Sequence, residues 1–158
     1  MFSLFNRRLN YIILTILILI LQINFPSIIF FNYKLNLDLV LVYFTFLVFL
    51  NGSYKYIIYA FLYGLILDIV ISVDQLGLLS FIKSFTVFLL LSIRSYDNIW
   101  SLRVKYFSVF LIYLFHFLFY YTILYSDFFS VIFLISFFQT FFSFILFLLI
   151  ANFFIKIK

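Results

Sequence analysis

Long apolar runs alternate with short polar groups along the whole chain. Each run is rich in Phe, Leu and Ile, whereas the breaks carry turn residues such as Asn51-Gly52-Ser53. Apolar runs of about 20 residues are typical of transmembrane helices. The pattern therefore predicts one transmembrane domain over residues 1–158, folded as an all-α, compact bundle of six spans. The predicted spans are residues 10–31, 35–50, 55–73, 76–93, 106–125 and 128–150.

The composition agrees with this class. Hydrophobic residues make up 68% of the chain and charged residues only 9%, whereas soluble domains carry ~25% charged residues. A small water-soluble domain has too little interior to hide so much apolar surface. The chain also lacks cysteine, which excludes disulfides, thiolate metal ligands and a cysteine nucleophile.

The first apolar run allows two interpretations. Arg7 and Arg8 followed by the apolar residues 11–21 match the beginning of a secretory signal peptide. No small-residue cleavage site follows, however, because the chain continues Gln22-Ile23-Asn24-Phe25-Pro26. We therefore expect an uncleaved first span that bends or ends near Pro26, the only proline.

The basic residues predict the orientation in the membrane. With six spans and a cytoplasmic N-terminus, the outer side carries Lys34 alone, and Lys83 falls within a span. The cytoplasmic side then carries eight basic residues, namely Arg7, Arg8, Lys55, Arg94, Arg103, Lys105, Lys156 and Lys158. This is the distribution of the positive-inside rule, so both termini are expected in the cytoplasm. The net charge of +5 is thereby explained, and no nucleic-acid partner is expected.

A charged residue inside the third apolar run is the main candidate for function. The stretch from Tyr63 to Ser80 contains Asp68, with apolar neighbours on both sides, and two of the three glycines, Gly64 and Gly77. An ionisable residue inside a membrane is costly, which makes it a functional-site hypothesis by default. The alternative is that Asp68 caps a helix end or lies in a hydrated pocket.

Small residues mark one face of each of the two helices around Asp68. Ala60, Gly64, Asp68 and Ser72 are spaced by four and share a face of the third span, where another helix can approach closely. Gly77, Ser80 and Ser84 form a comparable face on the fourth span, with Lys83 at its edge. A short turn makes the two spans antiparallel neighbours, so an Asp68–Lys83 ion pair is expected. The alternative is that Lys83 extends to the outer interface.

Polar residues also line single faces of the other spans. We expect them to point inward and to form hydrogen bonds between helices. A lone histidine is more often such a partner than a metal ligand. These rows are Tyr113, His116 and Tyr120 on the fifth span, Ser136, Gln139, Thr140 and Ser143 on the sixth, and Thr15 and Gln22 on the first.

The residue types needed for catalysis are scarce. Glutamate is absent, the three glycines are too dispersed for a phosphate-binding loop, and no serine lies in a G-x-S-x-G context. No cluster has the spacing of metal ligands. These features argue against an enzyme, and no metal or cofactor is expected.

Three stretches resemble the rod shape-determining membrane protein MreD family. Gly64-Leu65-Ile66-Leu67-Asp68, followed after eight residues by Gly77-Leu78-Leu79, is similar to its G-[L/A]-x-x-D…[L]-G signature. The segment from Leu21 to Pro26, with Gln22, is similar to its L-Q-x-x-x-P motif. Lys34 to Leu39, with Asp38, is similar to its basic-Pro-[D/N] segment, although Leu35 replaces the usual proline. Length and predicted topology are similar too.

The resemblance implies a non-enzymatic scaffold in the bacterial inner membrane. Members of that family associate with the bitopic protein MreC and belong to the elongation machinery. This machinery couples actin-like MreB filaments to lateral peptidoglycan synthesis by RodA and its partner transpeptidase. By resemblance, Gly64, Asp68 and Gly77 shape the hairpin of the third and fourth spans, either for folding or for binding MreC. Lys83 is not a residue of the family pattern.

Two other functions remain as alternatives. The substrate-binding subunits of energy-coupling-factor vitamin transporters are also small six-span bundles, and Asp68 would then contact a ligand near the outer face. Against this, the only tryptophan, Trp100, lies in a predicted cytoplasmic loop. A membrane enzyme acting on lipid-linked substrates is the third hypothesis, and the shortage of acid/base residues disfavours it.

Overall fold

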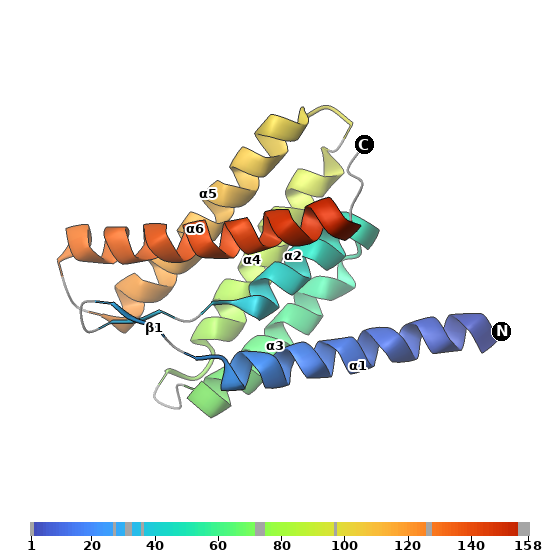
Figure 1. Cartoon of the computed structure of the whole chain (residues 1–158), viewed down its shortest axis with the longest axis horizontal. Helices are drawn as coiled ribbons and strands as arrows, with labels where there is room; N and C mark the ends of the chain where they lie inside the picture. The colour runs from blue at the N-terminus through green and yellow to red at the C-terminus, as the bar shows by residue number, and fades with distance from the viewer. Residues whose placement is uncertain are drawn as a thin grey trace.

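The computed structural model describes residues 2–26, 28–30, 33–35, 37–71, 75–96, 98–125 and 128–154. These residues form six helices and a two-stranded antiparallel hairpin (Figure 1). The helices are α1 (Phe2–Asn24), α2 (Leu39–Asn51), α3 (Lys55–Ile71), α4 (Leu78–Ser95), α5 (Leu102–Leu124) and α6 (Phe129–Phe154), and the strands are β1 (Ile28–Phe30) and β2 (Tyr33–Leu35). The six predicted helices are therefore present and in order.

The hairpin corrects the predicted boundaries of the first two helices. The helix expected over residues 10–31 ends at Asn24, because Pro26 has no N–H to donate and disfavours helical geometry in the residue before it. Ile28, expected in that helix, lies in β1 and pairs with Leu35 in β2. Leu35 was expected to open the second helix, which begins instead at Leu39.

The short helix α2 lies at the centre of the bundle. Nine of its 13 residues are buried, and it contacts α1, α3, α4 and α6. A helix that is apolar on all sides is expected to be surrounded in this way. It ends at Gly52, whose left-handed backbone (φ 58°) lets its N–H donate to the carbonyl of Val48 at 2.8 Å.

The chain runs back and forth, which gives the bundle two distinct ends. We call the end with β1 and β2 the hairpin end; the helices α2, α4 and α6 begin there (Figure 1). The helices α3 and α5 begin at the opposite end. Among the described elements, α3 and α4 make the most extensive contact, as the short turn between them predicts.

Three helices of the described chain are long and apolar enough to cross a membrane, namely α4, α5 and α6. The apolar helical stretches Ile13–Asn24 and Leu39–Asn51 are shorter, and α3 has 17 residues. Large apolar side chains also point outward; Phe141 and Phe142 on α6, for example, are 48% and 50% exposed. These are features of a membrane protein.

Some residues used in the sequence argument lie outside this description. Ser72, Lys156 and Lys158 are not among the described residues, and the side chains of Arg7, Arg8 and Lys34 are not described.

Candidate functional site

Asp68 caps the first turn of the neighbouring helix α4. Its side chain is fully buried and accepts four hydrogen bonds from the described residues. One oxygen, Oδ2, accepts from the backbone N–H of Gly77 (3.1 Å), from that of Ser80 (3.2 Å) and from the Ser80 hydroxyl (2.8 Å). The other, Oδ1, accepts from the N–H of Leu79 at 3.0 Å. Because the first N–H groups of a helix have no partner within it, Asp68 satisfies donors that would otherwise be buried unpaired.

The charge of Asp68 is favourable at this position. The N-terminal end of a helix carries a partial positive charge, and the carboxylate sits directly on it. The sequence allowed Asp68 to be a functional site, a helix cap or a residue in a hydrated pocket. The structure supports the helix cap, and the capped helix is α4 rather than α3, which contains Asp68.

Gly64 and Gly77 allow the carboxylate to reach α4. A Cβ at Gly64 would lie 2.6 Å from the backbone nitrogen of Ser80 and 2.9 Å from the carbonyl carbon of Leu79, so any side chain would push α3 and α4 apart. Gly77 has a left-handed backbone (φ 96°), and a Cβ there would meet nothing within 4 Å. Gly64 is therefore required because there is no space for a side chain, and Gly77 is favoured because of its left-handed backbone conformation.

Lys83 pairs with Asp38, so the expected Asp68–Lys83 pair is wrong. The Lys83 ammonium donates to Oδ2 of Asp38, and the residue is only 2% exposed. Extension of Lys83 to the interface is therefore wrong as well. The reason is charge compensation: the start of α4 already supplies four donors to Asp68, whereas Asp38 accepts one backbone N–H and, without Lys83, would be a buried charge without a cation.

Asp38 joins three helices through one carboxylate. It is the N-cap of α2, because its Oδ1 accepts from the N–H of Leu41 at 2.8 Å. Its Oδ2 contacts Lys83 of α4 and lies 3.5 Å from Nε2 of His116 on α5. Nδ1 of His116 is in turn 2.8 Å from the hydroxyl oxygen of Thr86. We call Asp38, Lys83, Thr86 and His116 the Asp38 cluster.

The cluster is buried and its formal charges balance. Each of the four residues is at most 8% exposed. Loss of one partner from a buried ion pair leaves an uncompensated charge and costs about 3–5 kcal/mol. The expectation that His116 is an interhelical hydrogen-bond partner is confirmed, because it contacts α4 and the N-cap of α2.

Gln22 joins α1 to the start of α2, next to the Asp38 cluster. Its side-chain oxygen accepts from the N–H of Leu39 at 2.6 Å, so Gln22 and Asp38 each satisfy a donor in the first turn of α2. Thr15 lies two helical turns before Gln22 on α1, and its hydroxyl is hydrogen-bonded to the hydroxyl of Tyr43 on α2 at 3.1 Å. Thr15 and Gln22 therefore face the same helix, as expected. Pro26 is exposed beyond the end of α1, and its contribution is to end that helix.

The polar row on α6 is buried, but its hydrogen bonds differ from the expectation. Gln139 accepts from the hydroxyl of Tyr121 on α5 at 3.2 Å. Ser136 instead donates to the carbonyl of Ile132 in its own helix at 2.8 Å. The hydroxyl oxygens of Thr140 and Ser143 have no hydrogen-bond partner among the described residues. Interhelical bonding was thus wrongly expected for these last three, whose small size still permits close packing.

Thr86, His116 and Asp38 combine the residue types of a hydrolytic triad without its geometry. The Thr86 hydroxyl lies 2.7 Å from the carbonyl of Ile82, an ordinary bond within a helix. Its residue is only 1% exposed, and the surrounding backbone N–H groups belong to the interior of α4. An acyl-transfer site needs an accessible nucleophile and free donors for the oxyanion. Among the described residues, no group of three or more His, Cys, Asp or Glu is placed to hold a metal ion.

Comparisons of the chain with known protein families, with curated proteins and with solved structures find no match. Its function must therefore be argued from the geometry of this site.

Proposed function

We propose that this chain is an MreD-like scaffold of the bacterial inner membrane that acts through association with an MreC-like bitopic protein. One observation carries the proposal. The residues that resemble that family meet at two helix N-termini at the hairpin end. Gly64, Asp68 and Gly77 meet at the start of α4, while Gln22 and Asp38 meet at the start of α2.

The arrangement favours a structural role for these residues. The hydrogen bonds that the structure describes for Asp68 all come from backbone or hydroxyl donors of residues 77–80 at the start of α4, and they tie α3 to α4. A rigid hairpin presents a constant surface to a partner, which is what a scaffold requires. We accordingly propose a non-enzymatic function without a cofactor, with MreB, RodA and the transpeptidase engaged indirectly.

The proposed topology has six spans and cytoplasmic termini. The positions of the basic residues support it, because Lys55 begins α3, Arg94 lies in the last turn of α4, and Arg103 and Lys105 lie in the first turn of α5. All four are at the opposite end of the bundle, which the positive-inside rule assigns to the cytoplasm. The hairpin end would then face outward. At 13 residues, α2 is about 20 Å long, so β1 and β2 would complete the outer part of its crossing.

Complementation with a capping variant tests this function. In a strain of the source bacterium depleted of the protein, the wild-type chain should restore rod shape and retain an MreC-like protein on purification. Asp68→Ala should reduce both, because the donors of α4 lose their acceptor. Ile69→Ala is the matched control, since Ile69 is the next residue and is 61% exposed.

The results separate the competing functions. Normal shape in cells that lack the protein would contradict the scaffold. Recovery of a stoichiometric vitamin instead of a protein partner would favour a transporter subunit. Full activity of a stable Asp68→Ala protein would show that the capping carboxylate is dispensable for the function proposed.

A further inference from the structure

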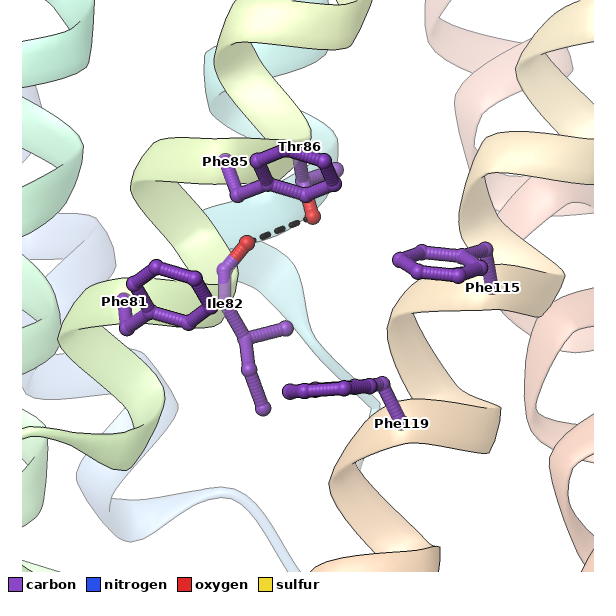
Figure 2. Close-up of a pocket in the computed structure, with 6 residues that line it drawn as sticks. All are labelled: Phe81, Ile82, Phe85, Thr86, Phe115 and Phe119. Carbon is purple, nitrogen blue, oxygen red and sulfur yellow. Dashed lines mark hydrogen bonds between the residues drawn. The ribbon is translucent and has the colours of Figure 1, made fainter.

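Two cavities lie along the contact between α4 and α5. The first, of about 170 Å³, is lined by four phenylalanines, with Ile82 and Thr86 (Figure 2). The phenylalanines are Phe81, Phe85, Phe115 and Phe119. Phe81 and Phe85 stack at 6.1 Å between ring centroids, and so do Phe115 and Phe119 at 5.9 Å. Figure 2 shows the two stacked pairs facing each other across the space between the helices.

The second cavity continues the same line toward the opposite end. It has a volume of about 310 Å³ and is lined by Leu89, Ser92, Ile93, Tyr96, Trp100, Ser108, Leu111 and Ile112. From Phe81 in α4 to Tyr96, the C-cap of that helix, the lining extends over 15 residue steps, or about 22 Å. The two cavities thus follow one another along the same two helices, and we call this apolar stretch the α4–α5 groove. Two of the residues that line it, Phe85 and Leu111, are 37% and 47% exposed on the outer surface.

The end of this groove has the chemistry of a membrane interface. The rings of Tyr96 and Trp100 stack there at 5.8 Å with an interplanar angle of 15°. Tyrosine and tryptophan concentrate where hydrocarbon meets the headgroups. The hydroxyl of Ser92 donates to the carbonyl of Phe88, so the groove wall stays apolar up to that level.

The charges at the same end are predominantly positive. The charged side chains that the structure describes on α4 and α5 at this end are Arg94, Arg103 and Lys105. Asp97, which lies outside the described residues, is the single acidic residue of the α4–α5 connection. Arg103 is exposed and follows Trp100 by three residues. A negative headgroup beside Trp100 would therefore meet an excess of positive charge.

We infer that this groove binds an anionic phospholipid, with an acyl chain against α4 and α5 and the headgroup at the Trp100–Arg103 end. A helix with its side chains is about 10–12 Å across, which is too wide to enter cavities of about 170 and 310 Å³. The apolar lining favours a thinner apolar occupant, such as an acyl chain. The charge selects an anionic headgroup over a zwitterionic one. The occupant is thus a lipid of the leaflet at the basic end.

Native mass spectrometry of the full-length protein tests the inference. The probes are phosphatidylglycerol and phosphatidylcholine with identical acyl chains, added to the protein in detergent micelles. Wild-type protein should retain phosphatidylglycerol preferentially. Arg103→Gln should reduce that preference about fivefold, the usual effect of one basic residue near an anionic surface, while Lys55→Gln on α3 should leave it nearly unchanged.

A second pair of variants locates the acyl chain. Leu111→Trp fills the larger cavity and should weaken retention of phosphatidylglycerol at least tenfold. Leu149→Trp on α6 is the control, since Leu149 is also outward-facing, at 56% exposure. Both sites are exposed, so folding is preserved. Equal retention of the two lipids by wild-type protein, or equal effects of the two tryptophans, would overturn the inference.

Discussion

Two buried carboxylates at the hairpin end are held in different ways. Asp68 is surrounded by neutral donors, three backbone N–H groups and one hydroxyl, from residues 9 to 12 positions away. Asp38 receives one backbone N–H from its own helix. Its other oxygen is paired with the ammonium of Lys83, 45 positions away, and faces His116 on a third helix.

The difference separates two solutions to one problem. A charge inside the membrane must be compensated, either by the dipoles of a helix end or by an opposite charge. Compensation by a helix end, as at Asp68, tolerates replacement of the carboxylate by a neutral side chain that still accepts hydrogen bonds. Compensation by an opposite charge, as at Asp38, does not tolerate loss of one partner, because the charge left behind is buried.

The largest effect is expected from Lys83→Met. The substitution leaves Asp38 without its cation and should lower the free energy of unfolding by about 3–5 kcal/mol. Titration of the purified protein with a denaturing detergent measures this value. Ser84→Ala is the neighbouring control, because the hydrogen bond that the structure describes for Ser84 goes to the carbonyl of Phe81 in its own helix. Equal stability of the two variants would mean that the ion pair contributes nothing.

The sequence predicted the Asp68 site better than the Asp38 site for a physical reason. Asp68, Gly64 and Gly77 are joined by a short turn, so helical spacing alone brings them together. Asp38 is the N-cap of α2, and Lys83 lies in α4. Their pairing depends on which helices pack around α2, and the hydrophobic periodicity of the sequence does not encode that arrangement. The sequence did single out Asp38 through its family-like segment, but it gave no means of finding its partner.

The helix pattern likewise predicted most of the fold but missed the hairpin. Pro26 indicated where α1 ends. Residues Ile28 to Phe31 continue the apolar run of α1, however, so composition did not separate a strand from a continued span. For Thr140 and Ser143 the sequence indicated the inward face correctly, but not that their hydroxyls have no hydrogen-bond partner in the described part of the chain.

A smaller effect is expected at Gly64, which allows α3 to approach α4. Gly64→Ala places a methyl group against the backbone of Ser80 and should cost about 1–3 kcal/mol of unfolding free energy through overpacking. It should also weaken the Asp68 cap by moving α4 away. Gly77→Ala is the comparison. A methyl group has space there, and only the positive φ is unfavourable for alanine, which should cost about 1 kcal/mol of unfolding free energy. A larger loss from Gly77→Ala would refute close packing at Gly64.

Of the three substitutions Lys83→Met, Gly64→Ala and Asp68→Asn, the last is expected to have the smallest effect. The amide oxygen still accepts from α4, but its NH₂ group faces donors and the favourable charge at the helix end is lost. A loss of about 1–2 kcal/mol in unfolding free energy is expected, measured by the same titration. A loss as large as that from Lys83→Met would indicate that Asp68 also needs a cation.

The most direct test is to measure which carboxylate is energetically coupled to Lys83. Lys83→Met is combined once with Asp38→Asn and once with Asp68→Asn, and unfolding free energies complete the two double-mutant cycles. The Asp38 cycle should give a coupling of at least about 2 kcal/mol, whereas the Asp68 cycle should be additive within about 0.5 kcal/mol. Strong coupling of Lys83 to Asp68, with none to Asp38, would contradict the distinction between the two sites.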